Sequence, residues 1–235
     1  MRAGRWLLMS AALASTSMAR ENDDRLIYGA HFEEFEYRTG DNAKLLAWDG
    51  GAFVGNDDMR AHWFVEGEYD MDESAVEHLE NRAAMQWPVS DFFDVKAGVR
   101  LDYFGGGKDR WYAVLGATGL APQWFESDID LFVGEGGRTS LRLDAEYELL
   151  LSNHLILIAS GETTYAFAED TKAEIGRGFT GVELGLRLSY DLLDRSVSPY
   201  IGAVYETKYG DTAEMAHEGD DTENWFFVAG VKLML

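Results

Sequence analysis

Apolar and polar side chains alternate along most of this chain with a period of two residues. The segment from Val182 to Tyr190 shows it without a break: valine, leucine and tyrosine take every second position, and acid, base, glycine or serine lie between them. A period of two places the two kinds of side chain on opposite faces of a β-strand. An aliphatic face suits lipid, and a face of mixed charge and glycine suits a wet interior. The pattern therefore predicts a membrane-spanning β-barrel.

The pattern recurs in about twelve segments, each long enough to cross a bilayer at a tilt, for which roughly 9 to 11 residues suffice. They cover approximately residues 25–37, 42–54, 60–70, 75–86, 92–104, 109–120, 123–134, 138–150, 154–168, 179–190, 198–209 and 223–235. The predicted fold class is all-β, a transmembrane antiparallel β-barrel of about 12 strands with no helical segment. A soluble barrel or sandwich remains the alternative, because its strands also alternate but turn the apolar face inward.

The beginning of the chain indicates export. Basic residues Arg2 and Arg5 precede a short apolar run over 6–14, and residues 17–19 form a small-x-small cleavage signal. We therefore expect a signal peptide over residues 1–19 and one outer-membrane barrel domain over 20–235. With the N-terminus of that domain in the periplasm, the two longest connections, 169–178 and 210–222, would lie outside the cell.

The charge balance narrows the set of partners. The chain has 20 Lys and Arg against 42 Asp and Glu, a formal net charge of -22. Such a surplus argues against nucleic acid and favours cations. The chain contains no cysteine, which excludes disulfides and thiolate metal sites. A soft metal would have to use methionine or histidine.

Several motifs resemble those of the copper-resistance protein B family of Gram-negative outer membranes, in the family's order and over about residues 40–235. They are found at residues 40–50, 65–68, 96–100, 115–122, 132–139, 183–188 and 227–231. The resemblance implies a barrel in the cell outer membrane that contributes to copper tolerance, with copper ions, membrane lipid and periplasmic copper-resistance proteins as partners. Family members commonly carry a methionine- and histidine-rich stretch before the barrel. Here only about residues 20–24 separate the expected signal peptide from the first strand.

Copper(I) favours thioether and imidazole ligands, whereas copper(II) favours imidazole and oxygen. The best local cluster of such ligands is the last expected outer loop, where Met215 and His217 would share a face if the loop were extended. An acidic loop is more often only a solvated surface.

A second candidate copper site lies on the third and fourth strands. His62, Glu66 and Glu68 share one face, and a hairpin closing near 71–74 would bring His78 opposite Glu66 or Glu68. The competing interpretation is a network of salt bridges and hydrogen bonds, which a polar barrel interior needs with or without metal. If the site binds copper, replacing Glu66, Glu68 and His78 together should weaken copper association without preventing assembly.

Further acidic residues are expected to face the interior and attract cations, as acidic rings do in cation pores. They are Asp94, Asp102, Asp128, Asp130, Asp144, Glu146, Glu148, Glu183 and Glu206. Arg100, Arg142 and Arg187 would offset part of their charge. No metalloprotease, phosphate-binding or serine-hydrolase motif is present, so we do not expect an enzyme. The favoured function is binding or passage of copper through an acidic lumen, and a general cation-permeable or structural outer-membrane protein is the alternative. A membrane-embedded hydrolase, whose site would be built from scattered strand residues without a local motif, is a third and less favoured class.

Overall fold

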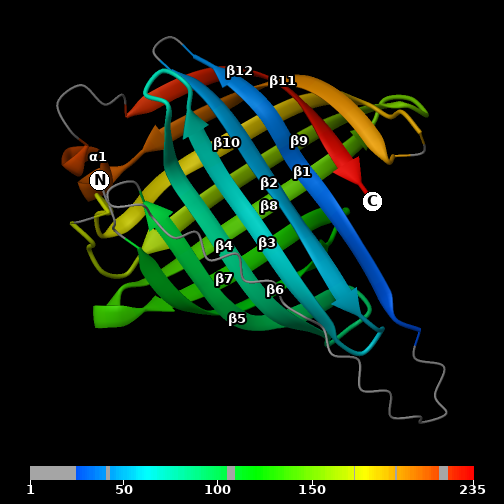
Figure 1. Cartoon of the computed structure of the whole chain (residues 1–235), viewed down its shortest axis with the longest axis horizontal. Coiled ribbons are helices and arrows are strands. Elements are labelled where there is room, and N and C mark those ends of the chain that lie inside the picture. The colour runs from blue at the N-terminus through cyan, green and yellow to red at the C-terminus, as the bar shows by residue number, and fades with distance from the viewer. Residues whose placement is uncertain (1–24, 41–42, 105–108, 172, 194, 217–221) are drawn as a thin grey trace, which may run out of the picture.

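The computed structural model describes residues 25–40, 43–104, 109–171, 173–193, 195–216 and 222–235. These residues form twelve strands and two short helices (Figure 1). The elements are β1 (Ile27–Thr39), β2 (Lys44–Gly55), β3 (Arg60–Asp70), β4 (Ala75–Pro88), β5 (Phe93–Phe104), β6 (Arg110–Ala121), β7 (Phe125–Gly134), η1 (Glu135–Gly137), β8 (Thr139–Leu150), β9 (Leu155–Ala166), β10 (Gly178–Tyr190), β11 (Val197–Lys208), α1 (Gly210–Met215) and β12 (Glu223–Met234).

The strands close into one antiparallel barrel. Each strand pairs with its neighbours in the chain, and β1 pairs with β12, so the described sheet has no free edge. Closure satisfies the backbone hydrogen bonds of every strand within the sheet, as a bilayer requires. The predicted all-β barrel of about twelve strands is therefore confirmed, and each predicted strand end differs from the observed one by at most two residues.

The apolar face of the strands points outward. In β10, Leu184 and Leu186 are about half exposed on the outer wall, whereas Arg187 and Ser189, which follow them on the opposite face of the strand, are buried inside. A soluble barrel or sandwich would have the opposite arrangement. The outward apolar face therefore decides against that alternative and leaves a polar lumen.

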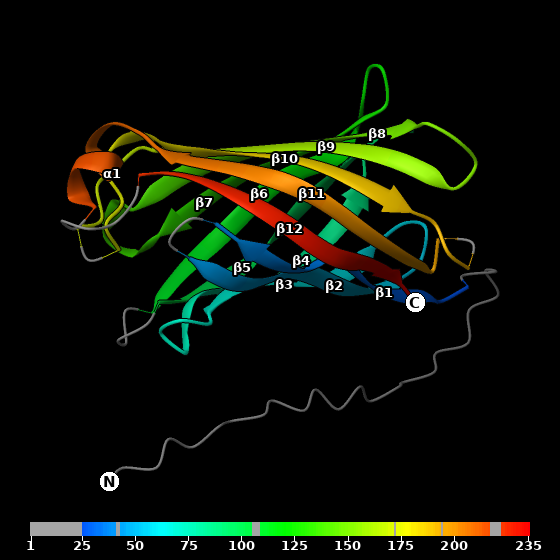
Figure 2. The ribbon, with the colours of Figure 1, turned by 90° about the horizontal axis from the view of Figure 1, so that it is seen from above.

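The expectation that the chain has no helical segment was wrong at two short places, the 3-10 helix η1 between β7 and β8 and the helix α1. The connection between β11 and β12 contains α1, whose buried Thr212 accepts a hydrogen bond at Oγ1 from the backbone N–H of Gly176, in the connection before β10. This contact ties two connections together at the end of the barrel opposite the C-terminus (Figure 2). Among the described residues, no helix is long and apolar enough to cross a membrane.

A β-bulge interrupts the two-residue alternation in β1. The register with β2 shifts between Phe32 and Glu34, and the register with β12 shifts between Phe32 and Glu36. One extra residue in a strand re-aims the side chains that follow it. As a result, Glu33 and Glu34 both reach cationic side chains of the lumen: Glu33 pairs with Lys232, and Glu34 pairs with Arg187.

Candidate functional site

The lumen wall carries two rows of carboxylates that run from strand to strand. In each row, every acidic residue is the direct cross-strand neighbour of the next. The first carboxylate row crosses β1 to β5 and consists of Glu34, Asp49, Glu66, Glu80 and Asp102. The second carboxylate row crosses β7 to β11 and consists of Asp128, Asp144, Glu162, Glu183 and Glu206. Because β6 and β12 separate them, the two rows lie on opposite halves of the wall.

The carboxylate rows are electrostatically costly. Like charges directly opposite each other destabilise a sheet, and a charge removed from water must be paired or neutralised. A lumen built only for stability would place acid opposite base. The rows therefore require cations close to them, either from the protein itself or from a bound ion.

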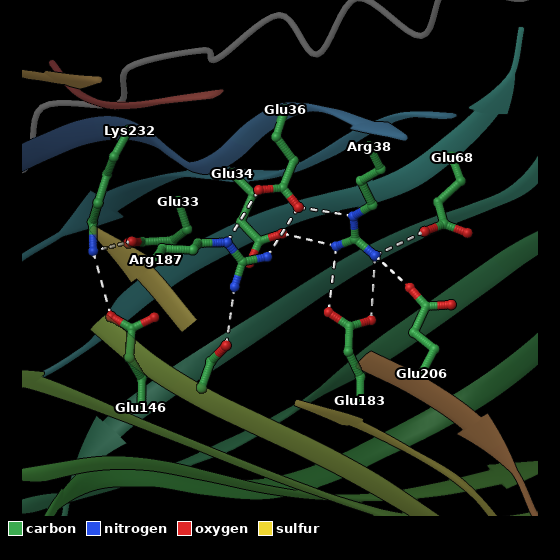
Figure 3. A network of polar contacts seen from close by, with 11 residues as sticks. Glu33, Glu34, Glu36, Arg38, Glu68, Glu146, Glu183, Arg187, Glu206 and Lys232 are labelled. Atoms are coloured by element: carbon green, nitrogen blue, oxygen red, sulfur yellow. Dashed lines mark hydrogen bonds and ion pairs between the residues drawn. The ribbon is translucent and has the colours of Figure 1, made fainter. Parts of the chain in front are cut away.

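Arg38 is the main protein cation at one side of the rows. Its guanidinium pairs with five carboxylates among the described residues, at distances from 2.7 to 3.3 Å (Figure 3). These partners are Glu34, Glu36, Glu68, Glu183 and Glu206. Since they lie on β1, β3, β10 and β11, the contacts of Arg38 connect the two rows across the β1–β12 junction.

Arg142 connects the two rows a second time. It extends from β8 and lies 3.2 Å from Glu66 and 3.0 Å from Glu80, both in the first row, and 3.3 Å from Glu162 in the second. Its side chain is 13% exposed, which limits screening of these pairs by water. The predicted compensating role of Arg142 is thus confirmed, and its geometry makes it a bridge between the two halves of the wall.

Further cations serve individual acids rather than both rows. Arg187 pairs with Glu34 at 2.7 Å and with Glu36 at 2.9 Å (Figure 3). Lys232 pairs with Glu33 at 2.6 Å and reaches Glu146 at 3.6 Å (Figure 3). The competing interpretation from the sequence, a lumen network of salt bridges, therefore describes a real part of this interior.

The protein's own cations do not balance the acids around the inner cavity. This cavity has a volume of about 310 Å³, and the described residues that line it include twelve carboxylates but three arginines. Asp130 is 1% exposed; its Oδ2 pairs with Arg82 and Lys96, but its Oδ1 has no hydrogen-bond donor. A second cavity of about 370 Å³ at the α1 end shares Glu162 and Glu183 with the first. Two acid-lined spaces thus meet at two members of the second carboxylate row.

The structure confirms the expected hairpin register at the predicted site on β3 and β4, whereas copper binding there stays a prediction. His78 lies directly opposite Glu68, as one of the two expected registers required. However, Arg38 pairs with Glu68 and Arg142 pairs with Glu66. Among the residues that the structure describes, one group of at least three has ligand atoms close enough for a metal ion, and it joins His78 to Glu80 and Asp102, all within 4.8 Å of one another.

The other predicted ligands lie elsewhere. His62 stacks between Phe53 and Phe64, with ring centroids 5.5 and 5.4 Å away, and neither ring nitrogen has a hydrogen-bond partner. Met215 is the last residue of α1 and is half-buried. His217 lies outside the described residues, so its position relative to Met215 stays a prediction.

Sequence reasoning missed Glu80, although a usable signal existed. Glu80 follows His78 by two residues, so both belong to one face of β4. Its neighbour Asp102 was expected to face inward, and the structure places it directly opposite Glu80. The direct pairing of carboxylates in two rows could not be derived without the strand registers.

Comparison with known proteins agrees with the geometry. The sequence model of a family described as "Copper resistance protein B precursor (CopB)" matches residues 26–235. Copper resistance protein B of Escherichia coli is 36% identical over 213 residues, covering 90% of this chain and 71% of that protein. The copper resistance protein B homolog of Pseudomonas syringae pv. tomato is 34% identical over 202 residues, covering 86% of this chain and 67% of that protein.

Among solved structures, a NanC porin matches with a TM-score of 0.53 and 14% identity, covering 89% of this chain and all of that one. At that identity the match supports the barrel fold alone. The similarity in sequence, by contrast, extends over nearly the whole barrel at more than 30% identity. The chain therefore belongs to the copper resistance protein B family.

Proposed function

We propose that this protein contributes to copper resistance from the outer membrane, by binding copper ions in its acidic lumen and passing them along it. The observation that carries the proposal is the inner cavity, where twelve lining carboxylates face three arginines. Carboxylate-lined interiors concentrate cations and exclude anions. The family relationship supplies the link to copper. In this proposal the protein is exported with residues 1–19 as a cleaved signal peptide and is not an enzyme.

The arrangement of the two cavities supports a route for ions. The cavity at the α1 end and the inner cavity have Glu162 and Glu183 in common. An ion that enters from the α1 end would pass between these carboxylates before it reaches the inner cavity. With both chain ends in the periplasm, the α1 end faces the outside of the cell. Periplasmic copper-resistance proteins would then exchange copper with the opposite end.

The ion pairs across the lumen favour a second candidate function. The contacts of Arg38 and Arg142 connect the carboxylate rows and occupy space that a wide pore would leave open. A structural outer-membrane protein, or a general cation pore without selectivity for copper, would need no more than this network. The two functions differ in metal selectivity, which can be measured directly.

The test is copper flux into liposomes that carry the refolded barrel, with zinc and magnesium as comparators, together with a count of bound copper per barrel. The double variant Glu162→Gln and Glu183→Gln should lower copper flux, since it neutralises the carboxylates shared by the two cavities. The control, Asp72→Asn with Glu223→Gln, neutralises two carboxylates outside those cavities and should leave flux unchanged. Tight binding without flux would favour retention of copper over passage. Equal flux of all three metals, or neither flux nor binding, would refute the proposal.

A further inference from the structure

We propose that His78, Glu80 and Asp102 form a copper(II) site, and that the guanidinium of Arg100 occupies its carboxylates when no metal is bound. This inference rests on the proposed function and assigns it to particular residues. The ligand atoms of the three side chains lie within 4.8 Å of one another. His78 and Glu80 share one face of β4, and Asp102 is the direct partner of Glu80 on β5. Rigid paired strands therefore bring the three together.

One oxygen of these two buried carboxylates has no hydrogen-bond donor. Glu80 and Asp102 are each 1% exposed. Glu80 Oε1 has no hydrogen-bond donor, and its nearest cation is Arg82 Nε at 3.5 Å. A buried carboxylate oxygen without a donor is costly unless a cation binds it. The oxygen without a donor and the clustering of the three side chains both indicate a ligand here.

An adjoining cavity gives an ion access to the group. It has a volume of about 200 Å³ at the α1 side of the lumen, and His78, Asp102 and Arg142 are among its lining residues. The space is large enough for an ion with several bound waters. An ion from this side therefore needs no rearrangement of the barrel wall to reach His78 and Asp102.

Arg100 is the cation that contacts both carboxylates, and a metal must displace it; Arg142, which lies 3.0 Å from the same oxygen of Glu80, contacts Glu80 alone of the two. Its Nε lies 2.6 Å from Asp102 Oδ1 and another of its nitrogens lies 2.8 Å from Oδ2, while a third lies 2.9 Å from Glu80 Oε2. The same guanidinium lies over the ring of Phe132, 4.3 Å from its centroid. A cation–π contact of this kind stabilises a guanidinium that leaves its carboxylates. Arg100 can thus act as a tethered counter-ion that exchanges with a metal ion.

The donor set selects the metal. One imidazole nitrogen with carboxylate oxygens suits a divalent ion of borderline softness, and among the common ones copper(II) binds such ligands most tightly. Neither thiolate nor thioether belongs to the group, so copper(I) is disfavoured. The site is therefore specific for the oxidised ion, with zinc as the weaker competitor.

Electron spin-echo spectroscopy tests the site, because it detects the remote nitrogen of an imidazole that coordinates copper(II). The sample is the refolded chain in detergent micelles with added copper(II). The imidazole modulation should disappear in His78→Gln and persist in His62→Gln. Copper(II) affinity, measured by competition with a chromophoric chelator, should fall on the order of 100-fold in His78→Gln, since even loss of a supporting outer contact costs about 10- to 100-fold. Because the substituted glutamine retains hydrogen-bonding groups, tryptophan fluorescence should report an assembled barrel.

Two arginine variants separate displacement of the Arg100 guanidinium by copper(II) from the general effect of removing one positive charge from the lumen. Arg100→Gln should raise copper(II) affinity by about tenfold, because the competing charge is gone. Arg187→Gln removes an equal lumen charge that binds Glu34 and Glu36 instead, and it should change affinity much less. Equal effects of the two variants, or unchanged imidazole modulation in His78→Gln, would overturn the site while leaving copper binding elsewhere in the lumen. Absence of copper binding by the unmodified chain would overturn both the site and the proposed function.

Discussion

Arg38→Gln should destabilise the barrel more than any loss of a surface ion pair. Among its five partners, Glu36 is the one whose side chain is fully buried, and their contact is 2.8 Å long. Removal of one partner from a buried ion pair costs about 3–5 kcal/mol. Glu36 retains Arg187, whose nitrogens lie 3.0 and 2.9 Å from its two oxygens. The cost at Glu36 should therefore lie near the lower end of that range.

The other four partners of Arg38 contribute less. Their side chains are between 23 and 35% exposed, so water screens them, and such pairs are worth roughly 0–1 kcal/mol each. Because all five contacts share one guanidinium, their energies do not add independently. We therefore expect the free energy of unfolding to fall by about 3–4 kcal/mol in Arg38→Gln.

Urea unfolding of the barrel in lipid vesicles, followed by tryptophan fluorescence, measures this loss. Lys44→Gln is the matched control, because Lys44 is 56% exposed and its contact with Asp72 is 3.7 Å long; it should change stability by less than about 0.5 kcal/mol. Magnesium should restore part of the stability of Arg38→Gln, since the variant leaves Glu68, Glu183 and Glu206 without their guanidinium. Unfolding of Arg38→Gln at the same urea concentration as the unmodified chain would refute this account of the lumen.

Two further predictions concern the wall. Leu184 is 51% exposed at the middle of β10, so Leu184→Arg should lower the free energy of unfolding in vesicles by about 2–4 kcal/mol. Leu149→Arg, near the end of β8, should cost about 0–1 kcal/mol, and equal losses in the two variants would contradict a lipid-facing wall. A side chain at Gly98 would meet the backbone of Ala83, so Gly98→Ala should cost about 1–3 kcal/mol in urea unfolding. Gly161→Ala is its control and should be tolerated, since the nearest atom is a flexible leucine carbon at 3.3 Å.

The barrel could be predicted from the sequence because its signal is local. Leu184, Leu186 and Arg187 reveal their faces through a period of two that needs no knowledge of partners. The hairpin between β3 and β4 could be predicted to within two registers, because its short turn limits the partner of His78 to Glu66 or Glu68; the structure shows Glu68. These features depend on residues close in the chain.

The lumen network was harder to predict from the sequence, because it depends on residues that are far apart in the chain. Arg38 meets Glu183 and Glu206 only when the barrel closes, and no local pattern indicates which arginine bridges which acids. The bulge in β1 also breaks the alternation from which side-chain direction is inferred. Glu80 shows a different limit, because it resembles any inward acid until its pairing with Asp102 is known.

The bulge in β1 also affects how the first and last strands pair to close the barrel. Until β1 meets β12, each is the edge of an open sheet with unpaired backbone groups, and such edges readily pair with another chain. The bulge turns Glu33 toward Lys232 of β12, where the two side chains lie 2.6 Å apart. Opposite charges on the two edges favour pairing with each other, while two copies of either edge repel. An irregularity of one residue thereby places an ion pair at the junction where the sheet closes.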